Sequence, residues 1–132
     1  MIVLDTCALV YDALTPHKLT AKAKNALINA EKMDQLFCCD ISLWEIGMLI
    51  QKKRLIPGTD TENFLLLLLQ ARQIKVLDIN IEIATIATTD ERFNHFDPAD
   101  RLIAATAIHL QIPIVSSDKG LKNIPGIELI LL

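Results

Sequence analysis

Short apolar runs rich in β-branched residues alternate with longer segments of helical periodicity, and this alternation restricts the fold more than any other feature. The expected strands are 2–4, 36–39, 75–79, 114–116 and 127–131, and the expected helices are 20–31, 43–53, 60–72, 80–88 and 98–110, with a short turn of helix after Thr6. Such alternation is typical of a parallel sheet with crossover helices. The strands lack clean polar alternation, as parallel strands covered on both faces do. We therefore expect a single α/β domain over residues 1–132.

Composition limits the setting in which the chain works. Hydrophobic residues make up 52% of the sequence, yet no apolar run approaches the roughly 18 residues of a membrane helix. The first segment has no basic residues before its apolar stretch and does not suit a secretion signal. Three cysteines without a C-x-x-C motif or a histidine at zinc spacing indicate reduced thiols in a cytoplasmic protein. The apolar excess suggests that a partner covers part of the surface.

The net charge of -3 argues against a protein that coats nucleic acid through bulk electrostatics. It leaves open a transient, enzymatic contact with nucleic acid through a local basic patch.

The segment FDPADRLIAATAIHLQIPIVSSDKG, residues 96–120, is apolar inside and acidic at both ends. From Asp100 the chain descends a helix of about 20 Å and climbs a strand of about 17 Å, so Asp118 returns to the level of Asp100. In a parallel sheet, strand carboxyl ends and the amino ends of the following helices share one edge. Asp5 follows the first strand, and Glu45 lies in the first turn of the expected helix 43–53. These four acids should converge where open α/β sheets bind ligands.

Each acid also has a structural explanation. Ser42 and Glu45 match the S-x-x-E capping box, Asp97 is a good N-cap, and Asp100 gains from the helix dipole. The other two acids suit turns. Four carboxylates at one edge, however, repel one another and lose hydration unless cations lie between them. Oxygen ligands without a histidine or cysteine set select Mg²⁺ or Mn²⁺, which activate water in phosphodiester cleavage. Convergence therefore predicts a metal-dependent nuclease.

Four segments together resemble the PIN-domain nucleases, specifically the VapC-type ribonuclease toxins of bacterial toxin-antitoxin pairs. They are MIVLDTCALV, SLWEIGML, DPADRLIAATA and IVSSDKGL, in this order over essentially the whole chain. The resemblance implies a three-layer α/β/α domain with a five-stranded parallel sheet. It also implies a Mg²⁺- or Mn²⁺-dependent endoribonuclease, a homodimer and neutralisation by a cognate antitoxin.

The resemblance assigns roles to individual residues. The acidic site of the family corresponds to Asp5, Glu45, Asp100 and Asp118, with supporting hydroxyls on Thr6 and Ser117. The four acids would hold the metal, directly or through water, and support the attack of water on phosphorus. Cys7 stands where serine is common, a change that should matter little. Phe96 stands where related sequences often have arginine, which leaves one phosphate contact of the family in doubt.

The cationic and aromatic residues have two readings each. Arg101 and Lys119, each next to an acid, would hold substrate phosphates or balance the neighbouring charge, and both readings stay open. The basic run 52–54 is interpreted as a solvated helix end rather than an RNA site. Trp44 and Phe64 are expected in the core rather than stacked on bases.

Two other functions compete with the nuclease. The first is a metal-dependent phosphatase acting on small phosphoesters. Phosphatases with an aspartyl nucleophile usually carry a second acid two positions after the first, and here that position is Cys7. The second is a catalytically silent PIN-fold interaction module, which would gain nothing from four mutually repelling acids.

Overall fold

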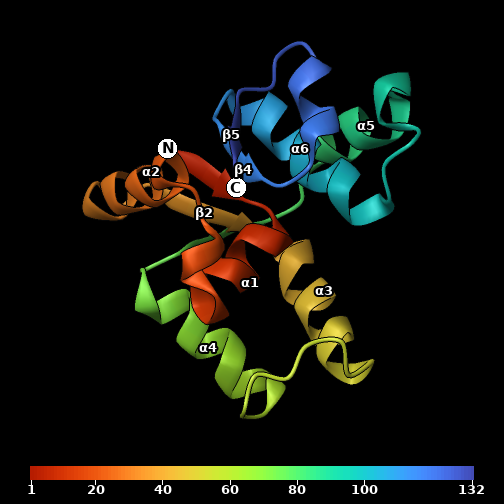
Figure 1. The fold of residues 1–132 in the computed structure, drawn as a ribbon. Coiled ribbons are helices and arrows are strands. Elements are labelled where there is room, and N and C mark those ends of the chain that lie inside the picture. The colour runs from red at the N-terminus through yellow and green to blue at the C-terminus, as the bar shows by residue number, and fades with distance from the viewer.

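Five parallel strands form the centre of the computed structural model, which describes residues 1–132 (Figure 1). The strands are β1 (Ile2–Leu4), β2 (Leu36–Cys39), β3 (Lys75–Leu77), β4 (Ile114–Ser116) and β5 (Leu129–Leu131). Their spatial order is β3-β2-β1-β4-β5. The chain therefore builds one half of the sheet outward from β1 and then crosses to build the other half from β4. The reversal lies between β1 and β4, which is where open α/β sheets bind ligands.

Six helices cover the sheet. They are α1 (Thr6–Leu14), α2 (Ala21–Lys32), α3 (Asp40–Gln51), α4 (Thr61–Ala71), α5 (Ile81–Thr89) and α6 (Pro98–Leu110), with short 3-10 turns η1 (Pro16–Lys18), η2 (Glu91–Phe93) and η3 (Lys119–Asn123). In Figure 1, α1 to α4 lie around one side of the sheet and α5 with α6 lies on the other. None of these helices has both the length and the apolar character needed to cross a membrane.

Alternate side chains of the strands bury the two faces of the sheet. Leu4 and Val115 point into a core shared with α1, α2 and α4, whereas Val3 and Ile114 point into a core shared with α6. All four are almost completely buried. The central strands β1 and β4 therefore have no polar face here, as predicted for parallel strands covered on both sides.

Helix α6 begins and ends where the sequence predicted. The side chain of Asp97 accepts a hydrogen bond from the backbone N–H of Asp100 at 2.9 Å, and Pro98 occupies the first helical position. The helix ends at Gln111, whose left-handed φ of 55° turns the chain toward β4. The N-cap role of Asp97 is confirmed, and it fixes Asp100 in the first turn at the carboxyl edge of the sheet.

Helix α3 begins three residues earlier than predicted. Its N-cap position is Cys39, which makes no side-chain capping bond, and Asp40 is already helical. Ser42 is fully buried inside the first turn and is hydrogen-bonded to Thr6 rather than to a helix end. The capping-box interpretation of Ser42 and Glu45 is therefore wrong, and Glu45 lies in the second turn of α3, not the first.

The other boundary differences have simple causes. β3 ends at Leu77 and β5 begins at Leu129 because the parallel register of each edge strand with its neighbour stops there: Leu77 is paired with Cys39 and Leu129 with Ile114. The short turn expected after Thr6 is the nine-residue helix α1.

Candidate active site

Asp5 lies between β1 and α1 and is buried, with 8% of its surface exposed. Its Oδ1 accepts a hydrogen bond from the backbone N–H of Ala8 at 2.8 Å, which caps α1. Burial raises the pKa of Asp5 to about 6, and the charges of Glu45 and Asp118 add to the increase, while hydrogen bonds from Ser116 and Ala8 oppose it. The helix cap therefore offsets only part of the penalty for burying this carboxylate.

Asp100 faces the same region from the first turn of α6. Burial raises its pKa to about 7, with further increases from Asp97, Glu45 and Asp5. Removal from water and like charge thus act in the same direction, and both disfavour the ionised carboxylate.

Asp118 completes the group from the loop after β4. Its Oδ1 accepts a hydrogen bond from the backbone N–H of Gly120 at 2.8 Å, which begins η3. Asp5, Asp100 and Asp118 border one cavity of about 10 Å³, together with Ser116 and an apolar floor of Ile103, Ile114 and Leu121. A cavity of that size has room for about one water-sized particle. The predicted convergence of these three acids at the β1–β4 reversal is present in the structure.

Glu45 reaches this group through a hydroxyl link. The Thr6 hydroxyl donates a short hydrogen bond to Glu45 Oε1, and the hydroxyls of Thr6 and Ser42 lie 3.0 Å apart. Burial raises the pKa of Glu45, the Thr6 hydrogen bond lowers it, and the charge of Asp97 raises it. Thr6 therefore fixes α3 and its carboxylate against the start of α1.

The carboxylate oxygens of this group suit a hard divalent cation. As the side chains are arranged here, however, no three histidine, cysteine or acidic side chains lie close enough together to ligate one. Asp5 and Asp118 each use only Oδ1 to cap a helix. All donors are oxygens, the cavity is ion-sized, and the acids raise one another's pKa. A cation would relieve that repulsion. The residues that would hold it are Asp5, Glu45, Asp100 and Asp118.

Comparison with known proteins identifies the family. A family model described as the PIN domain matches residues 2–127. The chain belongs to the PIN domain family. The domain is 28% identical over 122 residues to "Ribonuclease VapC22" of Mycobacterium tuberculosis, covering 92% of this chain and 90% of that protein.

Solved structures share the fold of this PIN domain. The VapBC2 complex from Rickettsia felis bound to a promoter DNA fragment matches with a TM-score of 0.75 and 20% identity, over 99% of this chain and 98% of that one. A toxin-antitoxin complex from Klebsiella pneumoniae matches with a TM-score of 0.65 and 19% identity, over 97% and 96% of the two chains. The predicted three-layer PIN fold with a five-stranded parallel sheet is confirmed.

The supporting role inferred for Ser117 stays a prediction, and the neighbouring Ser116 lines the cavity of the acids. Ser117 is exposed in the segment between β4 and η3. Ser116 is buried instead, accepts the backbone N–H of Asp118 at 3.0 Å and hydrogen-bonds to Asp5. The alternation of β4 carries the signal that was missed, because Ser116 falls on the same face as buried Ile114.

The two predicted cationic contacts lie outside the acidic group. Arg101 donates to the carbonyl oxygen of Phe93 and to Asn94 Oδ1, each at 2.9 Å, and therefore ties α6 to η2 rather than balancing an acid. Lys119 is exposed at the start of η3 and makes no ion pair. A role in holding phosphate remains a prediction for both.

Of the two aromatic predictions, one is confirmed and one is wrong. Phe64 is buried in the core with α1 and α2. Trp44, expected in the core, is 61% exposed on α3. The helical pattern of apolar residues in the sequence does not distinguish residues at the centre of the buried face from residues at its edge, such as Trp44.

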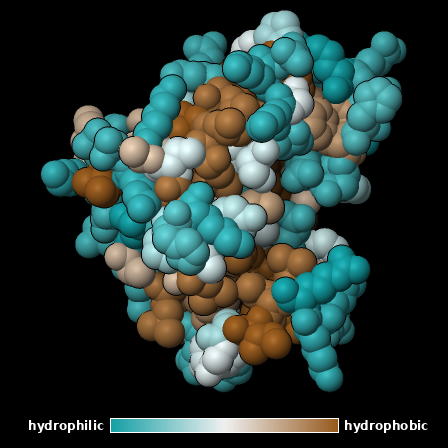
Figure 2. All heavy atoms as spheres, in the orientation of Figure 1, coloured by the Kyte–Doolittle hydropathy of each residue, from teal (hydrophilic) through white to brown (hydrophobic).

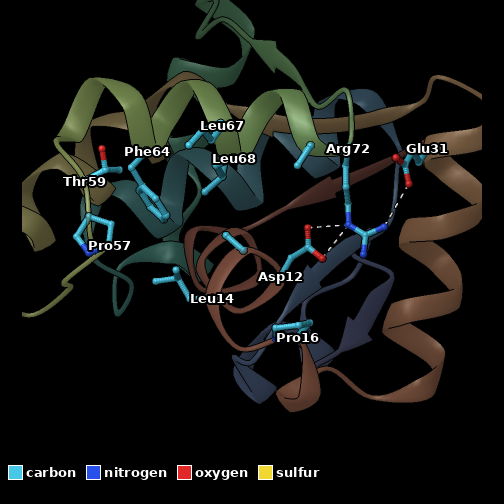
Figure 3. Close-up of a pocket in the computed structure, with 12 residues that line it drawn as sticks. Asp12, Leu14, Pro16, Glu31, Pro57, Thr59, Phe64, Leu67, Leu68 and Arg72 are labelled. Atoms are coloured by element: carbon cyan, nitrogen blue, oxygen red, sulfur yellow. Dashed lines mark hydrogen bonds and ion pairs between the residues drawn. The ribbon is translucent and has the colours of Figure 1, made fainter.

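A second hollow of the PIN domain, about 530 Å³, lies between α1 and α4 and is unlike the acidic one (Figure 3). Leu14, Phe64 and Leu67 line its apolar part. At one end Arg72 holds two acids: its Nε lies 2.8 Å from both oxygens of Asp12, and its Nη1 lies 3.2 Å from Glu31.

Proposed function

We propose that this PIN domain is a Mg²⁺- or Mn²⁺-dependent endoribonuclease and the toxin of a toxin-antitoxin pair. The observation that carries the proposal is the gathering of Asp5, Asp100 and Asp118 around one ion-sized cavity, with Glu45 beside them. The relative from Mycobacterium tuberculosis, a ribonuclease, and the structural neighbours, which are toxin-antitoxin complexes, support the same activity.

Each acid has a defined part in the proposed reaction. A bound divalent cation supplies an acidified water and neutralises charge that develops on the phosphate. Asp5, Asp100, Asp118 and Glu45 hold that cation. Thr6 keeps Glu45 turned toward the group, and Ser116 fixes both Asp5 and the backbone of Asp118. The raised pKa values of Asp5 and Asp100 mean that cation binding displaces protons near neutral pH.

Substrate has open access to the acids. A hollow of about 610 Å³ adjoins the site and is lined by Asp100, Asp118, Arg92, His95 and Gly120 among others. Arg92 and His95 line this hollow together with two of the carboxylates. A phosphodiester that enters this hollow therefore contacts Asp100 and Asp118.

We propose that the antitoxin covers apolar surface on the α1 side of the sheet. Figure 2 displays apolar side chains over the lower part of the molecule, where Figure 1 places α1, α3 and α4. The groove of Figure 3 supplies an apolar lining with charged groups at one end, which suits an amphipathic peptide segment. It borders α2 through Glu31. We also propose a homodimer, which light scattering at micromolar concentration tests.

Cleavage assays test the proposed activity. Purified protein should cut RNA with Mg²⁺ or Mn²⁺ and stop in EDTA. The Asp100→Asn variant should lose more than about 100-fold in rate, because even outer partners of metal ligands commonly account for 10- to 100-fold. Asp34→Asn, the same chemical change at an exposed acid far from the site in sequence, is the matched control and should keep full activity. Robust cleavage in EDTA, or full activity of folded Asp100→Asn, contradicts the mechanism.

A further inference from the structure

Another hollow, of about 350 Å³, lies beside Glu45 and is lined by both aromatic and cationic side chains. Trp44, Glu45, Lys52, Arg54 and Asp97 contribute to it. Trp44 is the only tryptophan of the chain, directly precedes Glu45 on α3, and is 61% exposed. The hollow therefore shares Glu45 with the acidic site but presents an uncovered aromatic ring.

The two cations of this hollow are free to bind an external anion. The ion pairs of the structure involve Arg72, Lys75 and Arg92, and neither Lys52 nor Arg54 takes part in one. Helix α3 ends at Gln51, and Lys53 has a left-handed φ of 58° that turns the chain back. The turn is closed by a hydrogen bond from Arg54 N–H to the Leu49 carbonyl at 2.9 Å. It brings Arg54 back to the hollow lined by Trp44.

We infer that this hollow is an RNA subsite, in which Trp44 stacks on the base of a nucleotide next to the scissile phosphate and Lys52 and Arg54 hold adjacent backbone phosphates. The inference rests on the proposed ribonuclease function and extends it to substrate recognition. Aromatic stacking combined with a cationic groove is how proteins bind single strands without reading sequence. The run 52–54 is exposed at the end of α3, as predicted from the sequence, and the inference adds a ligand for two of its three residues.

The lining favours nucleic acid over a second protein chain. Four of its side chains are charged: Glu45, Lys52, Arg54 and Asp97. The centres of protein interfaces are depleted in charged residues, so an apolar protein contact centred on Trp44 would bury unpaired charge. A nucleotide instead offers a ring for Trp44 and phosphates for the two cations, while the acids of the hollow lie on the side of the proposed metal.

Tryptophan fluorescence tests the subsite directly, because Trp44 is the only tryptophan and excitation selective for tryptophan therefore reports on it alone. A single-stranded RNA of roughly 12 nucleotides, within the range of single-strand binding sites, is titrated into the protein in EDTA, where metal-dependent cleavage does not occur. Stacking should quench the emission. By fluorescence anisotropy of labelled RNA, Trp44→Ala should raise Kd roughly 5- to 150-fold, as expected for loss of one stacked base. Trp44→Phe, which keeps a stacking ring, should retain most of the affinity.

The cations are tested by salt dependence. The Lys52→Gln/Arg54→Gln variant should reduce the slope of log Kd against log salt by up to about 1.4, since each phosphate contact to a single strand contributes about 0.7. The matched control, Lys24→Gln/Lys32→Gln, removes the same charge from exposed positions on α2 and should leave the slope unchanged. RNA binding without quenching, or equal losses in both double variants, overturns the subsite.

The outcome is separable from that of the proposed function. Fluorescence quenching and the loss of RNA affinity in Trp44→Ala are binding measurements, so their outcome does not depend on whether the protein cleaves RNA. Cleavage that proceeds with unaltered KM in Trp44→Ala overturns the subsite alone. Loss of a dimer in Trp44→Ala, measured by light scattering, would assign the ring to a contact between copies and also overturns the subsite.

Discussion

Two regions of the domain gather carboxylates, and they differ in what lies between the acids. Beside α1 and α4, Asp12 and Glu31 share the guanidinium of Arg72. At the β1–β4 reversal, Asp5, Asp100 and Asp118 surround a cavity with no cationic side chain in its lining. Burial raises the pKa of Asp12 as well, but Arg72 lowers it by charge and hydrogen bonding. Around Asp100, every main contribution raises the pKa.

The difference separates a structural cluster of acids from a candidate functional one. In the cluster of Arg72, Asp12 and Glu31, the arginine balances the charge of the two acids. The cluster therefore stabilises the packing of α1, α2 and α4 without an ion from solution. The acidic site has like charges, a small cavity and no internal cation. Such an arrangement destabilises the folded state unless a cation binds, and this is the physical ground for the metal proposal.

Removing the internal cation should give the largest change in stability. In Arg72→Met the aliphatic stem remains, but Asp12 and Glu31 lose their partner while Asp12 stays largely buried. Unfolding in urea should report a loss of about 2 to 3 kcal/mol, the scale of hydrogen bonds to charged groups. Lys75→Met, which breaks an exposed pair with Asp34, is the control and should lose less than about 1 kcal/mol. Equal losses of unfolding free energy in Arg72→Met and Lys75→Met would contradict the distinction between the buried and the exposed ion pair.

Adding an external cation should affect the other region only. At 100 times its Kd, Mn²⁺ should stabilise the parent by about 2.7 kcal/mol, a rise of several degrees in melting temperature. Asp100→Asn should lose most of this rise. In EDTA the variant should be at least as stable as the parent, because the substitution removes a repelling charge. If Asp100 only complements the α6 dipole, the variant should instead lose about 0.3 to 1 kcal/mol in EDTA and keep the Mn²⁺ shift.

The smallest effect is expected from pH. The pKa values of Asp5 and Asp100 rise from an ordinary 3.8 to about 6 and about 7 in the folded protein. The folded state therefore binds these protons more tightly than the unfolded chain does. That contribution to stability is complete below about pH 4 and is lost as the pH rises through 6 and 7. Melts in EDTA should fall by a few degrees between pH 5 and pH 8, and less in Asp5→Asn/Asp100→Asn. A parent and variant with the same pH profile would contradict the assignment.

The sequence predicted the edge of the sheet at which the acids meet, because that edge follows from chain direction alone. Asp5, Asp100 and Asp118 are each tied to a strand or helix end, and those ends were predicted within a residue. Glu45 was assigned to the correct helix but the wrong turn. The S-x-x-E pattern predicts a capping box within α3, but Ser42 instead forms a tertiary hydrogen bond with Thr6.

Side-chain orientation was the part that sequence could not supply. Trp44 is apolar and lies in a helix with a buried face, so hydrophobicity predicted it inside, whereas its side chain lies on the exposed side of α3. Likewise, two adjacent serines precede Asp118, and only the direction of β4 decides that Ser116 faces Asp5. The Arg72 cluster joins residues from three helices and has no local motif at all.

The wide separation of the acids along the chain has a consequence for protein synthesis. Asp5 and Asp118 stand near opposite ends of the sequence, yet they border the same cavity. Translation at 5 to 20 residues per second sets about 6 to 23 seconds between the addition of the first acid and the addition of the last. Until β4 has left the ribosome and docked beside β1, the centre lacks one of its acids. The acidic centre is therefore complete only after Asp118 has been made and β4 has docked beside β1.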